Sequence, residues 1–270
     1  MNKIKTLRYI LFATNWLIFS LPLIIHAQSR INERQAMNKG TCGKLMGTVA
    51  VLVVPVGSPQ QKWDEAHLLQ FRKHASRASR WLERSAKSCG EKLELHVICH
   101  LGKTLQLEVK DTCPSLSDIL PNSIGEDSLA SYLETNVLPY KFDQAVVIYV
   151  VQCHGRAFAR VTASNRSEKY YESIWYPFPL NEMDNPDEHA AAIAHEILHL
   201  FGAMDFYHLK SVPPAIQATI ARSIMLMPAE VPFEEWEVDP ITQYLIGWRK
   251  KPEKSWKAIF KQPNLELMAY

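Results

Sequence analysis

The chain has 270 residues, of which 47% are hydrophobic and 21% charged, a composition that excludes a largely disordered or fibrous protein. This length allows one large domain or two small ones, with a sizeable buried core in either case. The formal net charge of +2 is too small to indicate nucleic acid as a partner.

The first 27 residues have the pattern of a secretory signal peptide. Three basic residues, Lys3, Lys5 and Arg8, precede an apolar run. Pro22 breaks this run shortly before Ala27, a small residue suited to a cleavage site. Because the run is short and no stop-transfer charges follow, we expect a secreted or periplasmic protein without stable membrane insertion, an uncleaved anchor being the alternative. Cleavage would remove three basic and no acidic residues and change the formal charge from +2 to −1.

Two apolar segments and the stretch between them predict a βαβ unit. Residues 48–56 are a valine-rich run that should form a strand buried on both faces, and Gly57 ends it. Residues 61–88 carry apolar side chains at helical spacing. Residues 93–101 form a second apolar run, so the two strands should be parallel and joined by a right-handed crossover.

The rest of the chain continues the alternation of helices and strands. We expect a helix over 126–138, strands over 145–152 and 157–163, and an aromatic edge strand or rim segment over 170–178. A further helix should begin near Asp187, after the helix breaker Pro186. We therefore expect an α/β (α+β) fold, with a short N-terminal segment at 28–47 and a single domain over 48–270.

The motif HEILHLFGAMD, which starts at His195, favours a metal site over an ordinary buried helix. On a helix, His195 and His199 lie one turn apart on one face, so both imidazoles can bind one ion. Imidazole suits Zn²⁺, and Glu196 could accept a proton from a water molecule that the ion activates. Gly202 stands where a helix would end with a positive φ, which allows Asp205 to turn back toward the same ion.

The spacing HExxHxxGxxD resembles that of the metzincin zinc peptidases, whose third ligand is usually histidine and in some bacterial members aspartate. The segment RSIMLMP, residues 222–228, resembles the Met-turn of this family, with Met225 as the methionine below the metal. The resemblance implies a mixed twisted sheet with backing helices, a zinc-binding active-site helix and a C-terminal helix, here residues 239–248.

The same resemblance implies a zinc-dependent endopeptidase that hydrolyses protein or peptide substrates. One catalytic zinc ion would be bound by His195, His199 and Asp205. Glu196 would be the general base and then the proton donor to the leaving amine, and Gly202 and Met225 would support the site. In this family the substrate lies extended along an edge strand before the zinc helix, and residues 173–178 are the candidate segment.

Other interpretations of the motif stay open. The third ligand could be His208, three residues beyond Asp205. A gluzincin-like peptidase would use a later glutamate, Glu230, Glu234 or Glu235, although Gly202 argues against it because the chain should leave the helix there. A zinc-containing binding or structural protein without turnover is an alternative of a different class, but such a site would not need Glu196.

All five cysteines lie beyond the signal peptide, and in an exported protein some should pair. Cys42 and Cys89 each precede one of the first two strands, which should be adjacent and parallel, so we expect a Cys42–Cys89 disulfide. The second expected pair is Cys113–Cys153, with Cys99 left as a buried thiol. As an alternative, Cys42 resembles the cysteine switch of some metzincin zymogens, in which a thiolate blocks the zinc.

Overall fold

The computed structural model describes residues 42–57, 63–99, 105–106, 142–160, 172–179, 185–207, 209, 212–227 and 232–260. The chain divides into two units, Met1–Ala36 and Met37–Tyr270, and every described residue belongs to the second. The predicted signal peptide and the helix expected over 126–138 lie outside the described residues. In the part that the structure describes, no helix has both the length and the apolar character to cross a membrane.

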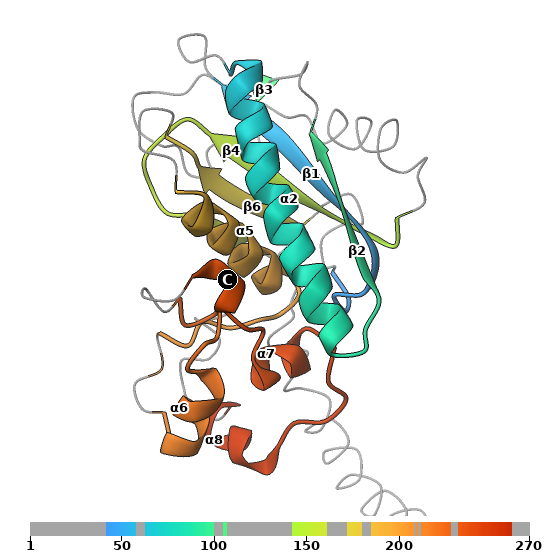
Figure 1. Cartoon of the computed structure of the whole chain (residues 1–270), viewed down its shortest axis with the longest axis vertical. Helices are drawn as coiled ribbons and strands as arrows, with labels where there is room; N and C mark the ends of the chain where they lie inside the picture. Colours follow the sequence, from blue (N-terminus) through green and yellow to red (C-terminus); the bar gives the residue numbers. More distant parts are fainter. Residues whose placement is uncertain are drawn as a thin grey trace, which may run out of the picture. The chain divides into compact units, whose positions relative to one another are not determined.

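A mixed sheet organises the second unit (Figure 1). Its strands are β1 (Gly47–Gly57), β2 (Leu93–Cys99), β3 (Leu105–Gln106), β4 (Gln144–Val151), β5 (Phe158–Arg160) and β6 (Glu172–Pro177). The strand order is β2-β1-β4-β6-β5, and β3 pairs with the end of β1. These pairs are parallel, except that β5 is antiparallel to β6. The predicted α/β (α+β) content and the parallel pairing of the first two strands are confirmed.

Strand β1 lies between β2 and β4, which explains its continuous apolar sequence. Val51 is paired with Val97 on one side and with Val146 on the other. Residues from Val49 to Val53 are all buried, so both faces of the strand are covered, as a valine-rich parallel strand requires.

Helices α2 (Glu65–Ser88) and α5 (Pro186–Leu200) contact each other and pack on one face of the sheet (Figure 1). Asp64 caps α2 by accepting a hydrogen bond from the backbone N–H of His67. Phe71 of α2 and Ile197 of α5 are fully buried in the same core as the β1 valines. Shorter helices follow: α6 (Pro214–Ile220), η2 (Phe233–Glu235), α7 (Pro240–Leu245), η3 (Lys254–Trp256) and α8 (Lys257–Phe260).

The expected edge position of residues 173–178 is wrong. Strand β6 pairs with β4 on one side and with β5 on the other, so it lies inside the sheet. Its aromatic character reflects burial, because Ile174, Trp175 and Tyr176 are all buried. Among the described strands, the one at this end of the sheet is β5.

The expected Cys42–Cys89 disulfide is also wrong, because Cys42, Cys89 and Cys99 are thiols. Gly47 has a φ of 75°, and the segment before it runs toward β4, where the Gly43 N–H donates to the side chain of Gln144 over 2.7 Å. Cys89 lies near β2, on the opposite side of β1. Cys113 lies outside the described residues, so the Cys113–Cys153 pair stays a prediction.

Candidate metal centre

Helix α5 carries the two histidines of the motif into the protein interior. It begins at Pro186, one residue before the predicted start near Asp187, and Asn185 caps it by accepting a hydrogen bond from the N–H of Glu188. From residue 193 to residue 200 every side chain of the helix is buried. His195 and His199 are therefore buried, and a buried imidazole is stable only when its nitrogen atoms have hydrogen-bond or metal partners.

The helix ends in a Schellman motif, which turns the chain back toward the histidines. Gly202 has a φ of 99°, and its N–H donates to the carbonyl of His199 over 2.9 Å. The N–H of Ala203 donates to the carbonyl of Leu198 over 3.0 Å, the second bond of this motif. The positive φ predicted for Gly202 is confirmed, and three residues later the chain places Asp205 beside the helix.

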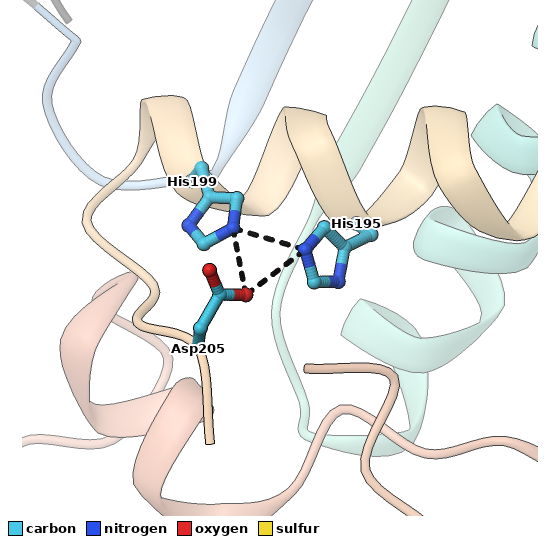
Figure 2. A group of neighbouring side chains, drawn as sticks. All are labelled: His195, His199 and Asp205. Carbon is cyan, nitrogen blue, oxygen red and sulfur yellow. Dashed lines mark hydrogen bonds and ion pairs between the residues drawn. The ribbon is translucent and has the colours of Figure 1, made fainter. Parts of the chain in front are cut away.

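Figure 2 shows that His195, His199 and Asp205 converge on one point, with both histidines on α5 and the aspartate on the segment after it. The two histidine Nε2 atoms are 3.0 Å apart. Oδ1 of Asp205 lies 3.1 Å from each of them. All three side chains are buried, with exposed fractions of 5% or less. Of the residues that the structure describes, these three form the one group of histidine, cysteine or acidic side chains that could hold a metal ion.

Backbone carbonyls fix which ring nitrogen of each histidine faces the centre. Nδ1 of His195 lies 3.1 Å from the carbonyl oxygen of Ile224, and Nδ1 of His199 lies 2.9 Å from that of Ala203. A carbonyl oxygen only accepts, so each Nδ1 carries the proton and donates it. In a neutral ring, Nε2 then presents its lone pair to the centre, as a metal ligand must.

The three converging acceptors could hold a cation. Two Nε2 lone pairs and a carboxylate oxygen at 3.0–3.1 Å from one another would repel if nothing positive lay between them. A proton on one Nε2 relieves part of this repulsion, and a metal ion bound by all three atoms relieves it fully. The donor set therefore fits a divalent metal ion.

The protonation states of His199 and Asp205 are coupled. Burial tends to lower the pKa of His199, but its hydrogen bond to Asp205 and the charge of Glu196 raise it above the ordinary value of 6.5. Burial tends to raise the pKa of Asp205, but the hydrogen bonds from His195 and His199 bring it well below the ordinary value. Asp205 is thus held as a carboxylate. Its second oxygen, Oδ2, accepts a hydrogen bond from the hydroxyl of Tyr207 over 2.7 Å.

Glu196 lies next to the centre but is not part of the three-residue group that could hold a metal ion. It is buried, and its carboxylate accepts a hydrogen bond from the backbone N–H of Ala159 in β5. Burial raises the pKa of Glu196, and this effect outweighs the opposing influence of His199 and His195. A carboxyl group with a raised pKa is a better proton acceptor at neutral pH than an ordinary glutamate.

The segment around Met225 supports the centre from another part of the chain. Met225 is fully buried, and its carbonyl oxygen accepts a hydrogen bond from the N–H of Phe206 over 3.1 Å. Phe206 directly follows Asp205, and the carbonyl that fixes His195 belongs to Ile224. The segment therefore holds both the helix and the loop that form the site. The role of Met225 as an apolar floor below the metal stays a prediction.

Some of the alternative ligands that the sequence suggested lie outside the described residues, and the others lie outside the group that could hold a metal ion. His208 and Glu230 lie outside the described residues. Glu234 forms ion pairs with Arg77 and Arg84, and neither Glu234 nor Glu235 belongs to the group that could hold a metal ion. Cys42 does not belong to that group either. Asp205 is the third member among the described residues, as the spacing predicted.

Sequence reasoning missed three contacts of the site. The spacing of Tyr207, two residues after Asp205, was a usable signal, because a side chain at that distance can reach back to the carboxylate. No local pattern pointed to the N–H of Ala159 or to the carbonyl of Ile224, since both depend on contacts between distant segments.

The chain matches no protein-family model, and no curated protein matches its sequence. The geometry of the metal centre and its surroundings is therefore the basis for a functional assignment.

Proposed function

We propose that the chain is a zinc-dependent endopeptidase with a metzincin-like fold. The observation that carries this proposal is the convergence of His195 Nε2, His199 Nε2 and Asp205 Oδ1, with separations of 3.0–3.1 Å. Zn²⁺ binds such atoms at about 2.0–2.2 Å, which places tetrahedral ligands roughly 3.3 Å apart, close to the separations found. Three protein ligands leave a fourth position open, which is the arrangement of a catalytic rather than a structural zinc site.

The hydrolysis that we propose depends on Glu196 as the proton carrier. Held by the three ligands, a zinc ion would supply a Lewis acid that lowers the pKa of a water molecule and polarises the scissile carbonyl. Glu196 would accept the proton of that water and then donate it to the leaving amine. The burial of Glu196 and its exclusion from the ligand group support this role, because a base must reach the water without occupying the metal.

We propose that the peptide substrate lies extended along β5 instead of β6. The resemblance to metzincins implies an edge strand as the binding surface, and β5 is the terminal strand of the described sheet that contacts α5. Ala159 of β5 donates its N–H to Glu196, so this strand borders the proposed base. Phe158 of this strand is 40% exposed, so its ring is accessible to a substrate side chain.

The proposed location is outside the cytoplasm, either secreted or periplasmic. It rests on the signal-peptide pattern of residues 1–27. The proposed partners are proteins or peptides as substrates.

Metal analysis combined with a cleavage assay tests the function. We expect one zinc ion per purified chain and cleavage of casein or of members of a peptide library, abolished by a chelator and restored by Zn²⁺. His199→Ala should lose both zinc and cleavage. His189→Ala is the matched control, since His189 lies on the same helix but outside the metal group and contacts Tyr176. Bound zinc without cleavage of any peptide would favour a binding or structural protein instead.

A further inference from the structure

Asp239 is a buried carboxylate that the proposed hydrolysis does not use. It is 1% exposed and caps the N-terminus of α7. Oδ1 accepts hydrogen bonds from the N–H groups of Ile241 over 2.9 Å and of Thr242 over 3.1 Å. A serine or an asparagine would cap a helix as well as an aspartate does, and a buried carboxylate is stable only when both oxygens are hydrogen-bonded. The cap alone therefore does not explain an aspartate at this position.

The second oxygen of Asp239 binds two hydroxyl groups, one of which lies far away in the sequence. Oδ2 accepts hydrogen bonds from Oγ of Ser223 and from Oγ1 of Thr242, both over 2.6 Å. Ser223 is also 1% exposed. While its hydroxyl proton is donated to Asp239, Ser223 Oγ accepts the N–H of Met225 over 3.1 Å. Asp239 thereby orients the Ser223 hydroxyl so that it fixes the backbone at Met225.

The backbone that Ser223 fixes contacts both parts of the metal centre. The carbonyl of Ile224 accepts the Nδ1 proton of His195, and the carbonyl of Met225 accepts the N–H of Phe206, next to Asp205. The N–H of Ile224 donates to the carbonyl of Glu237 over 3.0 Å, which ties the same segment to the chain just before Asp239. A shift of residues 223–225 would thus move the ring of His195 and the loop that carries Asp205.

We infer that Asp239 is a positioning residue of the metal centre, which acts through Ser223 on the two carbonyl groups that orient His195 and the Asp205 loop. The inference rests on the metal centre of the proposed function and not on its peptidase activity. Groups that orient metal ligands without touching the metal typically change metal affinity by about 10- to 100-fold when they are removed.

Two single substitutions separate this role from that of a buried helix cap. Ser223→Ala removes the hydroxyl that joins Asp239 to residues 223–225. Thr242→Val is the matched control, because it removes a hydroxyl bonded to the same Asp239 oxygen at the same distance, on a residue that makes no bond to that segment. For the full chain of each variant, zinc affinity is measured by competition with a chromophoric chelator. The visible absorption of the Co²⁺-substituted protein reports the ligand geometry.

We expect Ser223→Ala to weaken zinc binding by about 10- to 100-fold and to change the Co²⁺ spectrum. Thr242→Val should lower the resistance to denaturant while zinc affinity stays within about 3-fold and the spectrum is unchanged, because the carbonyl groups of residues 224 and 225 keep their places. Equal losses of affinity in the two variants, or an unchanged affinity in Ser223→Ala, would overturn the inference.

A double-mutant cycle tests the route from Asp239 to the metal. Asp239→Asn keeps the cap oxygen but places an amide where the Ser223 hydroxyl donates, so it should also weaken zinc binding. In a chain that already carries Ser223→Ala, the same change should have little further effect on affinity, because the route is already broken. Additive losses would contradict action through Ser223. If Ser223→Ala does not fold, the comparison of Asp239→Asn with Thr242→Val decides the question, and both can be measured whether or not the protein cleaves peptides.

Discussion

The hydroxyl of Tyr207 donates a hydrogen bond of 2.7 Å to Oδ2 of Asp205, the carboxylate oxygen that does not face the two histidines. One side chain thereby fixes the rotation of another, because Oδ1 can face both histidine Nε2 atoms only while Oδ2 points away from them. Tyr207 itself is 52% exposed, so this bond lies at the border between the buried centre and the solvent. A partly solvent-exposed side chain thus orients the carboxylate of Asp205.

Replacement of Tyr207 by phenylalanine should weaken zinc binding. The variant keeps the ring but leaves Asp205 Oδ2 without this donor, and we expect a loss of about 10-fold, near the lower end for such groups because water can replace part of the bond. The affinity is measured by chelator competition. Tyr176→Phe is the control, since it removes a hydroxyl bonded to His189 on the same helix and should leave zinc affinity unchanged. Equal affinities for wild type and Tyr207→Phe would show that the loop alone orients Asp205.

The Glu196→Gln substitution separates proton transfer from metal binding. Glutamine has nearly the same size but cannot accept the proton, so turnover should fall by about 10² to 10⁴ while zinc stays bound at one per chain. Glu188→Gln on an exposed turn of the same helix should change neither quantity. Peptide cleavage at the wild-type rate by Glu196→Gln would exclude Glu196 as the base.

Gly202 and Gly90 offer a matched test of the turn that leads to Asp205. Each follows a helix as the positive-φ residue of a Schellman motif, with φ of 99° and 80°. An alanine in this conformation costs about 1–2 kcal/mol, so both Gly202→Ala and Gly90→Ala should lower the free energy of unfolding by a similar amount. Zinc affinity should fall only in Gly202→Ala, because the strained turn displaces Asp205. A loss of affinity in Gly90→Ala would instead point to a general effect of instability.

The local features of the fold follow closely from sequence patterns. The valine-rich run at 48–56 predicted a strand buried on both faces, and its flanking helix and second strand predicted parallel pairing. The four-residue spacing of His195 and His199 predicted a shared helix face, and Gly202 predicted the positive φ. These predictions succeed because each depends on one element or on elements that follow one another directly along the chain.

The predictions about which strand lies at the sheet edge and about the path of the segment before β1 failed. The aromatic residues of β6 suggested an edge strand, but β5 pairs with its outer side. The pattern of apolar and polar residues within a strand does not determine which strands lie beside it. Cys42 precedes β1 as Cys89 precedes β2, yet the turn at Gly47 directs the first segment toward β4. The bond between Asp239 and Ser223 joins residues from separate segments, so no short motif could have indicated it.

The coupling of His199 and Asp205 also predicts how the metal-free protein responds to pH. The pKa of His199 is raised in the folded protein, despite the opposing effect of burial, by its hydrogen bond to Asp205 and by the charge of Glu196. A raised pKa means that the folded state binds the proton more tightly than the unfolded state, whose histidines titrate near 6.5. The resulting stability is fully present below about pH 6.5 and is lost as the pH rises through the raised pKa. Zinc binding displaces this proton, so affinity for zinc should increase over the same range.

We therefore expect the melting temperature of the metal-free protein to fall as the pH rises from about 6.5. The difference in melting temperature between zinc-loaded and metal-free protein should grow over the same range. Thermal unfolding with a chelator or with excess Zn²⁺, at a series of pH values, measures both quantities. Asp205→Asn is the control, because it removes the charge that raises the pKa of His199 and should flatten the fall in the metal-free protein. The other histidines are unchanged in this variant. The difference between wild type and Asp205→Asn in how the metal-free melting temperature depends on pH therefore reports on the His199–Asp205 pair. Parallel curves for wild type and Asp205→Asn would show that this pair does not share a proton when the metal is absent.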